Sequence, residues 1–264
     1  MEIRVGTSGY SFPDWRRAFY PAGLDKTKFL DFYVRYFPTV EINSTYYSIP
    51  HPKVMANMVK KVPPGFDFMV KVPQSITHRR TDLAGDSENF LGCIQPMAES
   101  GCLSGLLAQF PYSFKYSEDG LDYLSACRLA FRPHKLFVEF RHGSWVNRNT
   151  LNRLQETGIG YVSVDEPRLY GLLKPDLLVT GDVGYIRFHG RNAEHWWSGG
   201  ARRYDYNYSQ QELEEWLAKI EKVRNRIQRL YVYFNNCFKG QAAANALAFL
   251  DLVKSKREPG LQLN

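Results

Sequence analysis

Short runs of apolar and β-branched residues recur along the chain, and each has the length of a buried strand. Most of these runs are separated by segments whose apolar residues follow helical spacing. Such alternation is typical of parallel pairing, in which a helix crosses over from one strand to the next. The predicted strands are Ile3–Thr7, Val40–Asn43, Phe66–Val72, Gly105–Phe110, Leu136–Arg141, Gly160–Asp165, Tyr185–His189 and Leu230–Asn235.

The segments between these runs predict helices over residues 24–37, 87–101, 121–130 and 241–254. A further helix begins after Ser209, because Glu212 stands three residues later in the spacing of a capping box. Eight strands alternating with helices predict an α/β fold, a closed (β/α)₈ TIM barrel that forms a single domain over residues 1–264. An open doubly wound sheet is the alternative, disfavoured because no glycine-rich phosphate motif follows an early strand.

Polar and apolar residues alternate toward the ends of seven predicted strands. Alternate side chains of a strand point to opposite faces, and the strand ends of a barrel surround the opening where ligands bind. We therefore expect the apolar set to pack against helices and the polar set to point into the barrel. The polar set comprises Glu41, Asn43, Lys71, Gln109, Glu139, Arg141, Ser163, Asp165, Arg187, His189, Tyr233 and Asn235.

This mixture of acids and bases offers candidates for proton transfer. Glu139 or Asp165 is the predicted general base, and His189 or Lys71 the predicted general acid. Lys71 is also a candidate Schiff-base nucleophile. The alternative is that carboxylates and cations pair into a buried network that fills the barrel. The predicted catalytic residues are Glu41, Lys71, Glu139, Asp165 and His189.

The loops after the last two predicted strands resemble anion-binding loops. They read HGRNAEHWW (189–197) and NNCFKGQAAANA (235–246), in which Arg191 and Lys239 supply charge. Glycines let backbone amides approach a ligand, and the helix that begins near residue 241 directs its first amides to the same place. Solvated loop residues are the alternative. The predicted ligand-binding residues are Asn43, Gln109, Arg141, Arg187, Arg191, Trp196, Asn235, Asn236 and Lys239.

The amino-acid composition excludes few classes of binding partner. The net charge of +7 favours an anionic partner. Four cysteines without a CxxC pair, and no leader peptide, predict reduced thiols and a cytoplasmic protein. No apolar run approaches the roughly 18 residues of a membrane helix, so no membrane partner is expected. Three cations compete for the strand-end carboxylates, so no cofactor and no metal site are predicted, and a divalent metal is the less favoured alternative.

Long sequence blocks resemble the DUF72 family, also called YecE-like or TM1631-like proteins. They cover nearly the whole chain in order and read GTSGYSFPDWRRAFYP, VEINSTYYSIP, FMVKVPQSITH, LLAQFP, VEFRHGSW, YIRFHGRN, YDYNYSQQELEEW and YVYFNNCFKGQAAANA. The resemblance implies a TIM barrel related in shape to endonuclease IV and xylose-isomerase-like barrels, in a family of unassigned function. A role on nucleic acid has been suggested from the likeness to endonuclease IV. The histidine-rich zinc set of that enzyme has no counterpart, because only His189 among the strand-end residues is a histidine.

Three functional hypotheses follow. The first is a barrel enzyme, a hydrolase or lyase, or a binding protein for a phosphate-containing ligand such as a nucleotide or nucleic acid. The second is a carbohydrate-active hydrolase or isomerase-like barrel, which needs a carboxylate pair about 5–10 Å apart across an open cleft. The third is non-enzymatic nucleic-acid binding through a basic rim, with an affinity that falls steeply as salt rises. The oligomeric state is left open.

Overall fold

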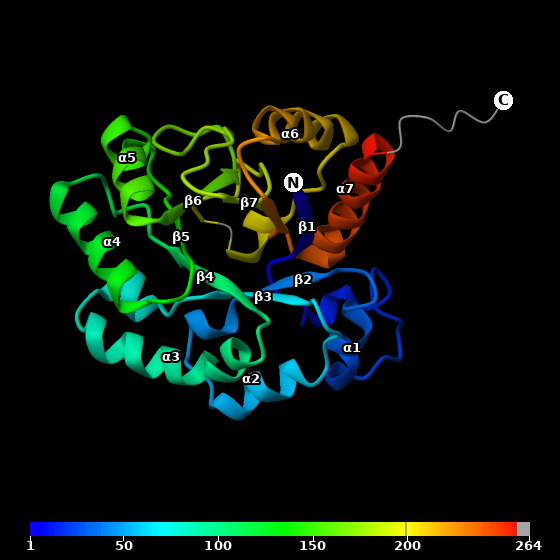
Figure 1. Ribbon diagram of the computed structural model, residues 1–264. Coiled ribbons are helices and arrows are strands. Elements are labelled where there is room, and N and C mark those ends of the chain that lie inside the picture. Colours follow the sequence, from blue (N-terminus) through cyan, green and yellow to red (C-terminus); the bar gives the residue numbers. More distant parts are fainter. Residues whose placement is uncertain (199, 258–264) are drawn as a thin grey trace.

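The computed structural model describes residues 1–198 and 200–257. Eight parallel strands form one sheet in the order β1-β8-β7-β6-β5-β4-β3-β2, and helices surround it (Figure 1). The predicted (β/α)₈ barrel is therefore confirmed. The strands are β1 (Glu2–Thr7), β2 (Thr39–Ile42), β3 (Asp67–Lys71), β4 (Leu103–Gln109), β5 (Leu136–Glu139), β6 (Ile159–Asp165), β7 (Val183–Phe188) and β8 (Arg229–Phe234).

Five of the seven α-helices of the described residues lie at predicted segments, and α2 and α5 do not correspond to any predicted helix. Ser209 and Glu212 form the predicted capping box at the start of α6. The segment predicted as one helix over residues 24–37 contains only five α-helical residues, preceded by a 3₁₀ turn. The α-helices are α1 (Phe29–Tyr33), α2 (Pro52–Val59), α3 (Leu83–Glu99), α4 (Glu118–Ala130), α5 (Arg148–Thr157), α6 (Gln210–Val223) and α7 (Gln241–Arg257).

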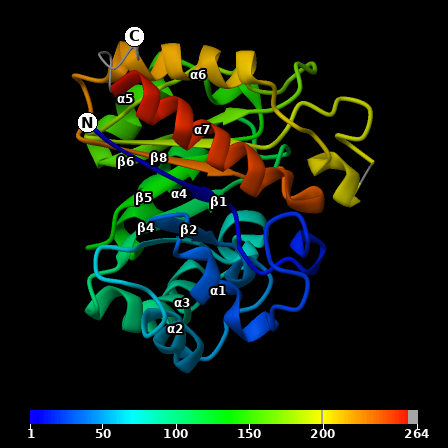
Figure 2. The same ribbon diagram turned by 90° about the vertical axis from the view of Figure 1, so that its right-hand side faces the viewer.

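The loops after the strands gather at one end of the barrel. In Figure 2 the segments that follow β1 and β7 lie at the end opposite to the N-terminus. These loops contain short helical turns that place side chains over the barrel opening. They include η3 (Ser44–Tyr46) after β2 and the π-helical η4 (Ser75–Arg79) after β3.

The barrel closes at a seam between β1 and β2. A parallel bridge joins Ser8 to Glu41 at the upper end of this seam. Below it, the Tyr33 hydroxyl of α1 accepts a hydrogen bond from the Thr7 amide at 2.9 Å and donates one to the Thr39 carbonyl at 3.1 Å. A helix side chain thus satisfies backbone groups that the two strands leave open. Closure depends on a tyrosine hydroxyl as well as on strand pairing.

Side chains point as predicted on the seven strands with alternating polarity, with the exception of β6. Phe137 points into the barrel and pairs with Gly160, where an added Cβ would lie 2.3 Å from the Phe137 ring. Gly160, Val162 and Val164 therefore face inward. Ser163 and Asp165 face outward, and the prediction that they point into the barrel is wrong.

We predict that Gly6→Ala opens the seam. A Cβ at residue 6 would lie 2.2 Å from the carbonyl oxygen of Thr39, so the backbones of β1 and β2 would have to separate. The expected loss is about 3 kcal/mol of unfolding free energy, measured by urea denaturation. Gly92→Ala is the control: this residue lies within α3 with open space around it, and alanine should stabilise the protein by about 0.5–1 kcal/mol. Equal effects of the two substitutions would contradict the role of the seam.

Candidate functional site

A buried arginine links two carboxylates across the barrel. Arg187, at the end of β7 and 2% exposed, donates from Nε and Nη2 to the two oxygens of Glu41 at 2.9 and 2.7 Å. Its Nη1 donates to Glu139 Oε2 at 2.6 Å. Tyr185 also donates its hydroxyl to Glu41. Both carboxylates are fully buried, so we call these groups and their neighbours the Arg187 network.

The network continues toward β5 and the loop that follows β6. Arg141 places Nε 2.7 Å from Glu139 Oε1 and donates from Nη1 to Glu166 at 3.2 Å. His189 Nε2 lies 3.1 Å from the same Glu139 oxygen, and its Nδ1 contacts the Asn235 amide nitrogen at 2.9 Å. Every acid of the network therefore has a cationic or hydrogen-bonding partner.

These contacts fix the ionisation of the buried groups. Burial acts to raise the pKa of Glu139, but Arg141 and Arg187 outweigh it and hold that pKa well below its ordinary value. Burial and Arg141 lower the pKa of His189 to about 3, against the pull of Glu139. Burial raises the pKa of Glu166 to about 7, although Arg141 opposes it. Glu139 is therefore a permanent anion and His189 a neutral imidazole, both sealed from solvent.

Above the network, two adjoining hollows of about 320 and 210 Å³ open at the C-terminal ends of the strands. We call them together the mouth cleft. This is the end of a barrel at which ligands bind. The hollows share Tyr46, Tyr47, Lys71, Gln109, Arg141 and Tyr204.

The mouth cleft is cationic. Lys71, Arg141, Arg187 and Arg203 line it, and none of its described lining residues is acidic. The first of these, Lys71, donates from Nζ to Gln109 Oε1 at 2.8 Å, and the structure gives it no ion pair over residues 1–198 and 200–257. Arg203 lies over the Trp196 ring at 5.2 Å, and its buried Nε has no hydrogen-bond partner.

Lys71 has an unusual electrostatic environment for a lysine. Burial lowers its pKa to about 7, and Arg187 adds to this effect more than Glu139 opposes it. The ammonium group lies 4.2 Å from the centroid of the Tyr46 ring. The hydroxyl of that tyrosine lies 3.1 Å from His78 Nε2, and burial and Lys71 lower the pKa of this imidazole to about 4. A titratable amine thus lies beside a neutral hydroxyl–imidazole pair.

The structure separates the predicted site residues into three groups. One group lines the mouth cleft, a second lies sealed beneath it, and a third lies elsewhere. The first group is Asn43, Lys71, Gln109, Arg141, Arg187, Trp196 and Asn235. The second is Glu41, Glu139 and His189, and the third is Asp165, Arg191, Asn236 and Lys239.

Asp165 belongs to a separate cluster between the sheet and α6. Its carboxylate accepts from Trp216 Nε1 at 2.6 Å and from the Tyr208 hydroxyl at 2.9 Å. Arg191 donates to both of its oxygens, at 2.8 and 2.7 Å, and to Glu212 at 2.8 Å. The expectation that Asp165 and Arg191 share one opening with Glu139 is wrong, because β6 has the opposite phase.

The loop after β8 also differs from the predicted anion site. The Lys239 amide donates to the carboxylate of Asp14 at 2.9 Å, and the Lys239 side chain is exposed. Asn236 is buried and donates to Asn245 Oδ1 and to the Tyr206 carbonyl, both at 2.8 Å. A protein carboxylate therefore occupies one backbone amide of the loop that was predicted to bind an anion.

Several aromatic and polar residues of the mouth cleft were not predicted from the sequence. Tyr46 and Tyr47 lie in or next to η3 after β2, and His78 lies in η4 after β3. Tyr112 follows β4. These turns are too short for any periodic pattern, so the one available signal was their position directly after a strand end.

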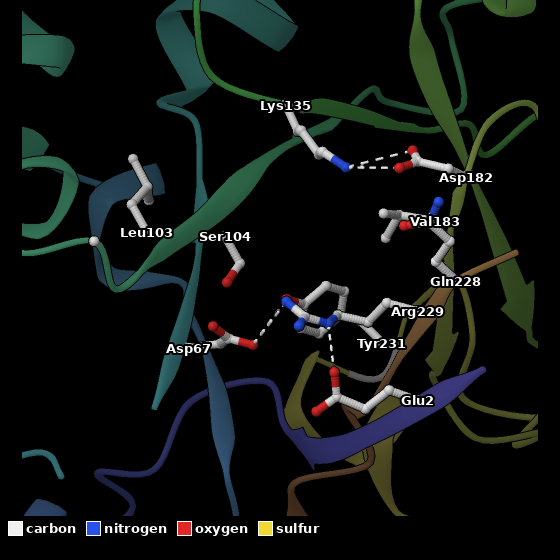
Figure 3. A pocket seen from close by; sticks show the side chains of 11 residues that line it. Glu2, Asp67, Leu103, Ser104, Lys135, Asp182, Val183, Gln228, Arg229 and Tyr231 are labelled. Carbon is white, nitrogen blue, oxygen red and sulfur yellow. Dashed lines mark hydrogen bonds and ion pairs between the residues drawn. The ribbon is translucent and has the colours of Figure 1, made fainter. Parts of the chain in front are cut away.

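A second cavity, of about 530 Å³, lies at the N-terminal ends of the strands. Figure 3 shows that its charged side chains pair with one another: Lys135 lies 3.3 Å from Asp182, and Arg229 lies 2.8 Å from Glu2. The Tyr231 hydroxyl donates to Asp67 at 2.8 Å. The end with an unpaired amine, the mouth cleft, is therefore the better candidate site.

No three His, Cys, Asp or Glu side chains come together to hold a metal ion within the part of the chain that the structure describes. Over the same residues, no helix combines the length and the apolar character needed to cross a membrane.

We predict that Arg187→Met strongly destabilises the fold. The substitution leaves Glu41 and Glu139 buried without their shared cation, and breaking a buried pair in this way costs about 3–5 kcal/mol. Chemical denaturation measures this loss. Arg224→Met is the control, because its partner Glu221 lies on the surface of α6, and a surface pair contributes about 1 kcal/mol or less. A loss no larger than that of the control would show that the Arg187 network does not hold the barrel together.

Comparison with known proteins agrees with this fold. The family described as "Protein of unknown function DUF72" matches residues 4–263. The UPF0759 protein YunF of Bacillus subtilis is 31% identical over 95% of this chain and 94% of its own length. A crystal structure of a DUF72 family protein from Thermotoga maritima has a TM-score of 0.90 and 42% identity, covering 96% of this chain and all of that one. Another from Enterococcus faecalis has a TM-score of 0.86 and 28% identity, covering 99% of this chain and all of its own. The chain belongs to the DUF72 family.

Proposed function

We propose that the mouth cleft binds a small ligand that carries a phosphate group, and that Lys71 transfers a proton to or from it. The observation that carries this proposal is the charge of the cleft. Four cations line it without any acidic neighbour among its described lining residues, and two of them, Lys71 and Arg203, have no carboxylate partner. Guanidinium groups hold phosphate oxygens through paired hydrogen bonds.

Aromatic side chains on the rim of the cleft suit a ligand that carries a planar ring beside its phosphate group. Tyr47 is 76% exposed and Trp197 is 55% exposed, although both line the cleft. The Trp197 ring lies 4.9 Å from that of Tyr112. Exposed aromatic faces of this kind stack on bases and other planar rings. A mononucleotide, which joins a planar base to a phosphate, has the chemistry that the cleft offers.

The proton-transfer role goes to Lys71 because the carboxylates cannot reach a ligand. Glu41 and Glu139 are fully buried and shared with Arg187. A glycosidase needs two carboxyl groups that face an open cleft, so this arrangement argues against a carbohydrate-active enzyme. A lysine with a pKa of about 7 is suited to acid–base work near neutral pH.

We predict that Arg203→Met weakens the binding of adenosine monophosphate by about tenfold or more, the cost of losing a charge-assisted pair. Isothermal titration calorimetry measures the affinity. Arg202→Met is the matched control, since this neighbour is exposed and does not line the cleft. Adenosine, which lacks the phosphate, should bind weakly to the native protein and to both variants.

Two outcomes would count against a small phosphate-bearing ligand. The first is that neither nucleotide nor inorganic phosphate binds, or that both arginine variants lose affinity equally. The second is that a single-stranded oligonucleotide binds tightly, with an affinity that falls steeply with salt, while the mononucleotide does not bind. That result would favour nucleic acid as the ligand.

A further inference from the structure

We propose that Lys71 is a nucleophile that forms a Schiff base with the carbonyl group of a phosphate-bearing aldehyde or ketone. The inference rests on the proposed function, because the arginines of the mouth cleft would hold the phosphate while the lysine meets the carbonyl. It assigns the cleft a covalent step and a substrate class.

Position gives the first argument. Lys71 is the last residue of β3, and it lines both hollows of the cleft. Its neighbours are an amide oxygen, Gln109 Oε1, at 2.8 Å and the face of the Tyr46 ring at 4.2 Å. Neither neighbour is an acid, so no carboxylate pairs directly with the amine among the described residues. The Arg187 network takes both nearby carboxylates instead.

The electrostatic setting gives the second argument. A Schiff base forms only from the neutral amine. With a pKa of about 7, about half of the Lys71 amines are neutral at neutral pH, against roughly one in three thousand at the ordinary value of 10.5. The charged groups that act on it are Arg187, Glu139, Glu41 and Arg141, in order of decreasing effect. Two cations lower the pKa of Lys71 and two anions raise it, and burial is the largest single cause of the lowered value.

The third argument is a neighbouring route for protons. Tyr46 carries its hydroxyl 3.1 Å from His78 Nε2, and Thr77 holds Nδ1 of the same imidazole at 2.9 Å. Burial and Lys71 keep the pKa of His78 at about 4, so the ring is neutral and can pass a proton on. The Tyr46 ring connects this hydroxyl–imidazole pair to the lysine, because the Lys71 ammonium group lies over the face of that ring. In the proposed step, this pair supplies the proton to the oxygen that must leave.

The step balances without any further reagent. The lone pair of Nζ attacks the carbonyl carbon, a C–N bond forms, and the π electrons of the carbonyl move to its oxygen. Two protons pass from nitrogen to that oxygen, by way of Tyr46 and His78, and the oxygen leaves as water. The C–N double bond forms from the remaining electron pair. Nothing is oxidised or reduced, and the products are one imine and one water.

Reductive trapping tests the inference. The full chain is incubated with glycolaldehyde phosphate and sodium cyanoborohydride, and the adduct is located by peptide mass mapping. The adduct is expected on Lys71, and absent from Lys71→Met and Lys71→Arg. Both variants should fold, because this lysine has no ion pair to lose among the described residues. Lys53→Met, on the surface of α2, is the matched control and should label as the native protein does.

The pH profile separates this amine from a surface lysine. Labelling of Lys71 should rise roughly tenfold from about pH 6 to about pH 8 and then level off, since the neutral fraction saturates above the pKa. A lysine of ordinary pKa gains roughly a hundredfold over the same interval and does not level off. Labelling spread over surface lysines, unchanged in Lys71→Met, would overturn the inference.

A third comparison tests the phosphate group, by using the same aldehyde with and without it. Glycolaldehyde without phosphate should label Lys71 at least about tenfold more slowly, because the anion site no longer holds it beside the amine. If adenosine monophosphate still binds through Arg203 but no adduct forms on Lys71, the Schiff base is wrong and the proposed function stands. If both aldehydes label Lys71 equally and the nucleotide does not bind, the proposed function fails, and with it the substrate class.

Discussion

One guanidinium group organises the interior of this barrel. Arg187 reaches from β7 to carboxylates on β2 and β5, and all three groups are nearly or fully buried. Charges in such a place are tolerated only when their partners are fixed, because desolvation of each ion costs several kcal/mol. The contacts therefore tie three strands that are not neighbours in the sheet. Because Arg187 neutralises both buried carboxylates, the C-terminal end of the barrel above them can carry further charged side chains.

The character of the mouth cleft follows from that compensation. Since Arg187 takes up both carboxylates, the charged side chains that line the cleft are all cations, and aromatic residues of the surrounding turns lie beside them. Arg141 is the link between the two levels: it pairs with Glu139 below and lies 5.7 Å from the Trp196 ring above. An anion in the cleft would meet cations whose counter-charges are held deeper in the barrel. The preference for anions that we propose would thus come from the separation of these cations from their buried counter-charges, more than from the modest net charge of the chain.

Much of the fold, and about half of the candidate site, could be predicted from the sequence. Period-two alternation identified the strands and put Lys71 and Arg187 on the inner face. The same rule failed on β6, because alternation states which residues share a face but not which face is inside. Here Asp165 finds Trp216 and Arg191 outside, while Gly160 leaves room for Phe137 inside. Such partners are far apart in the sequence, so only tertiary packing reveals them.

The residues around Lys71 show why chemistry is harder to predict than position. The sequence placed Glu41, Glu139 and Lys71 in one ring, where an ion pair to the lysine is the simplest expectation. Arginine competes better for buried carboxylates, because its planar fork donates several hydrogen bonds at once and it stays charged when desolvated. Lysine is left with the amide of Gln109, and a desolvated ammonium without an acid gives up its proton more easily. The reactivity that we propose for Lys71 therefore depends on the pairing of Arg187, which holds both carboxylates away from the amine.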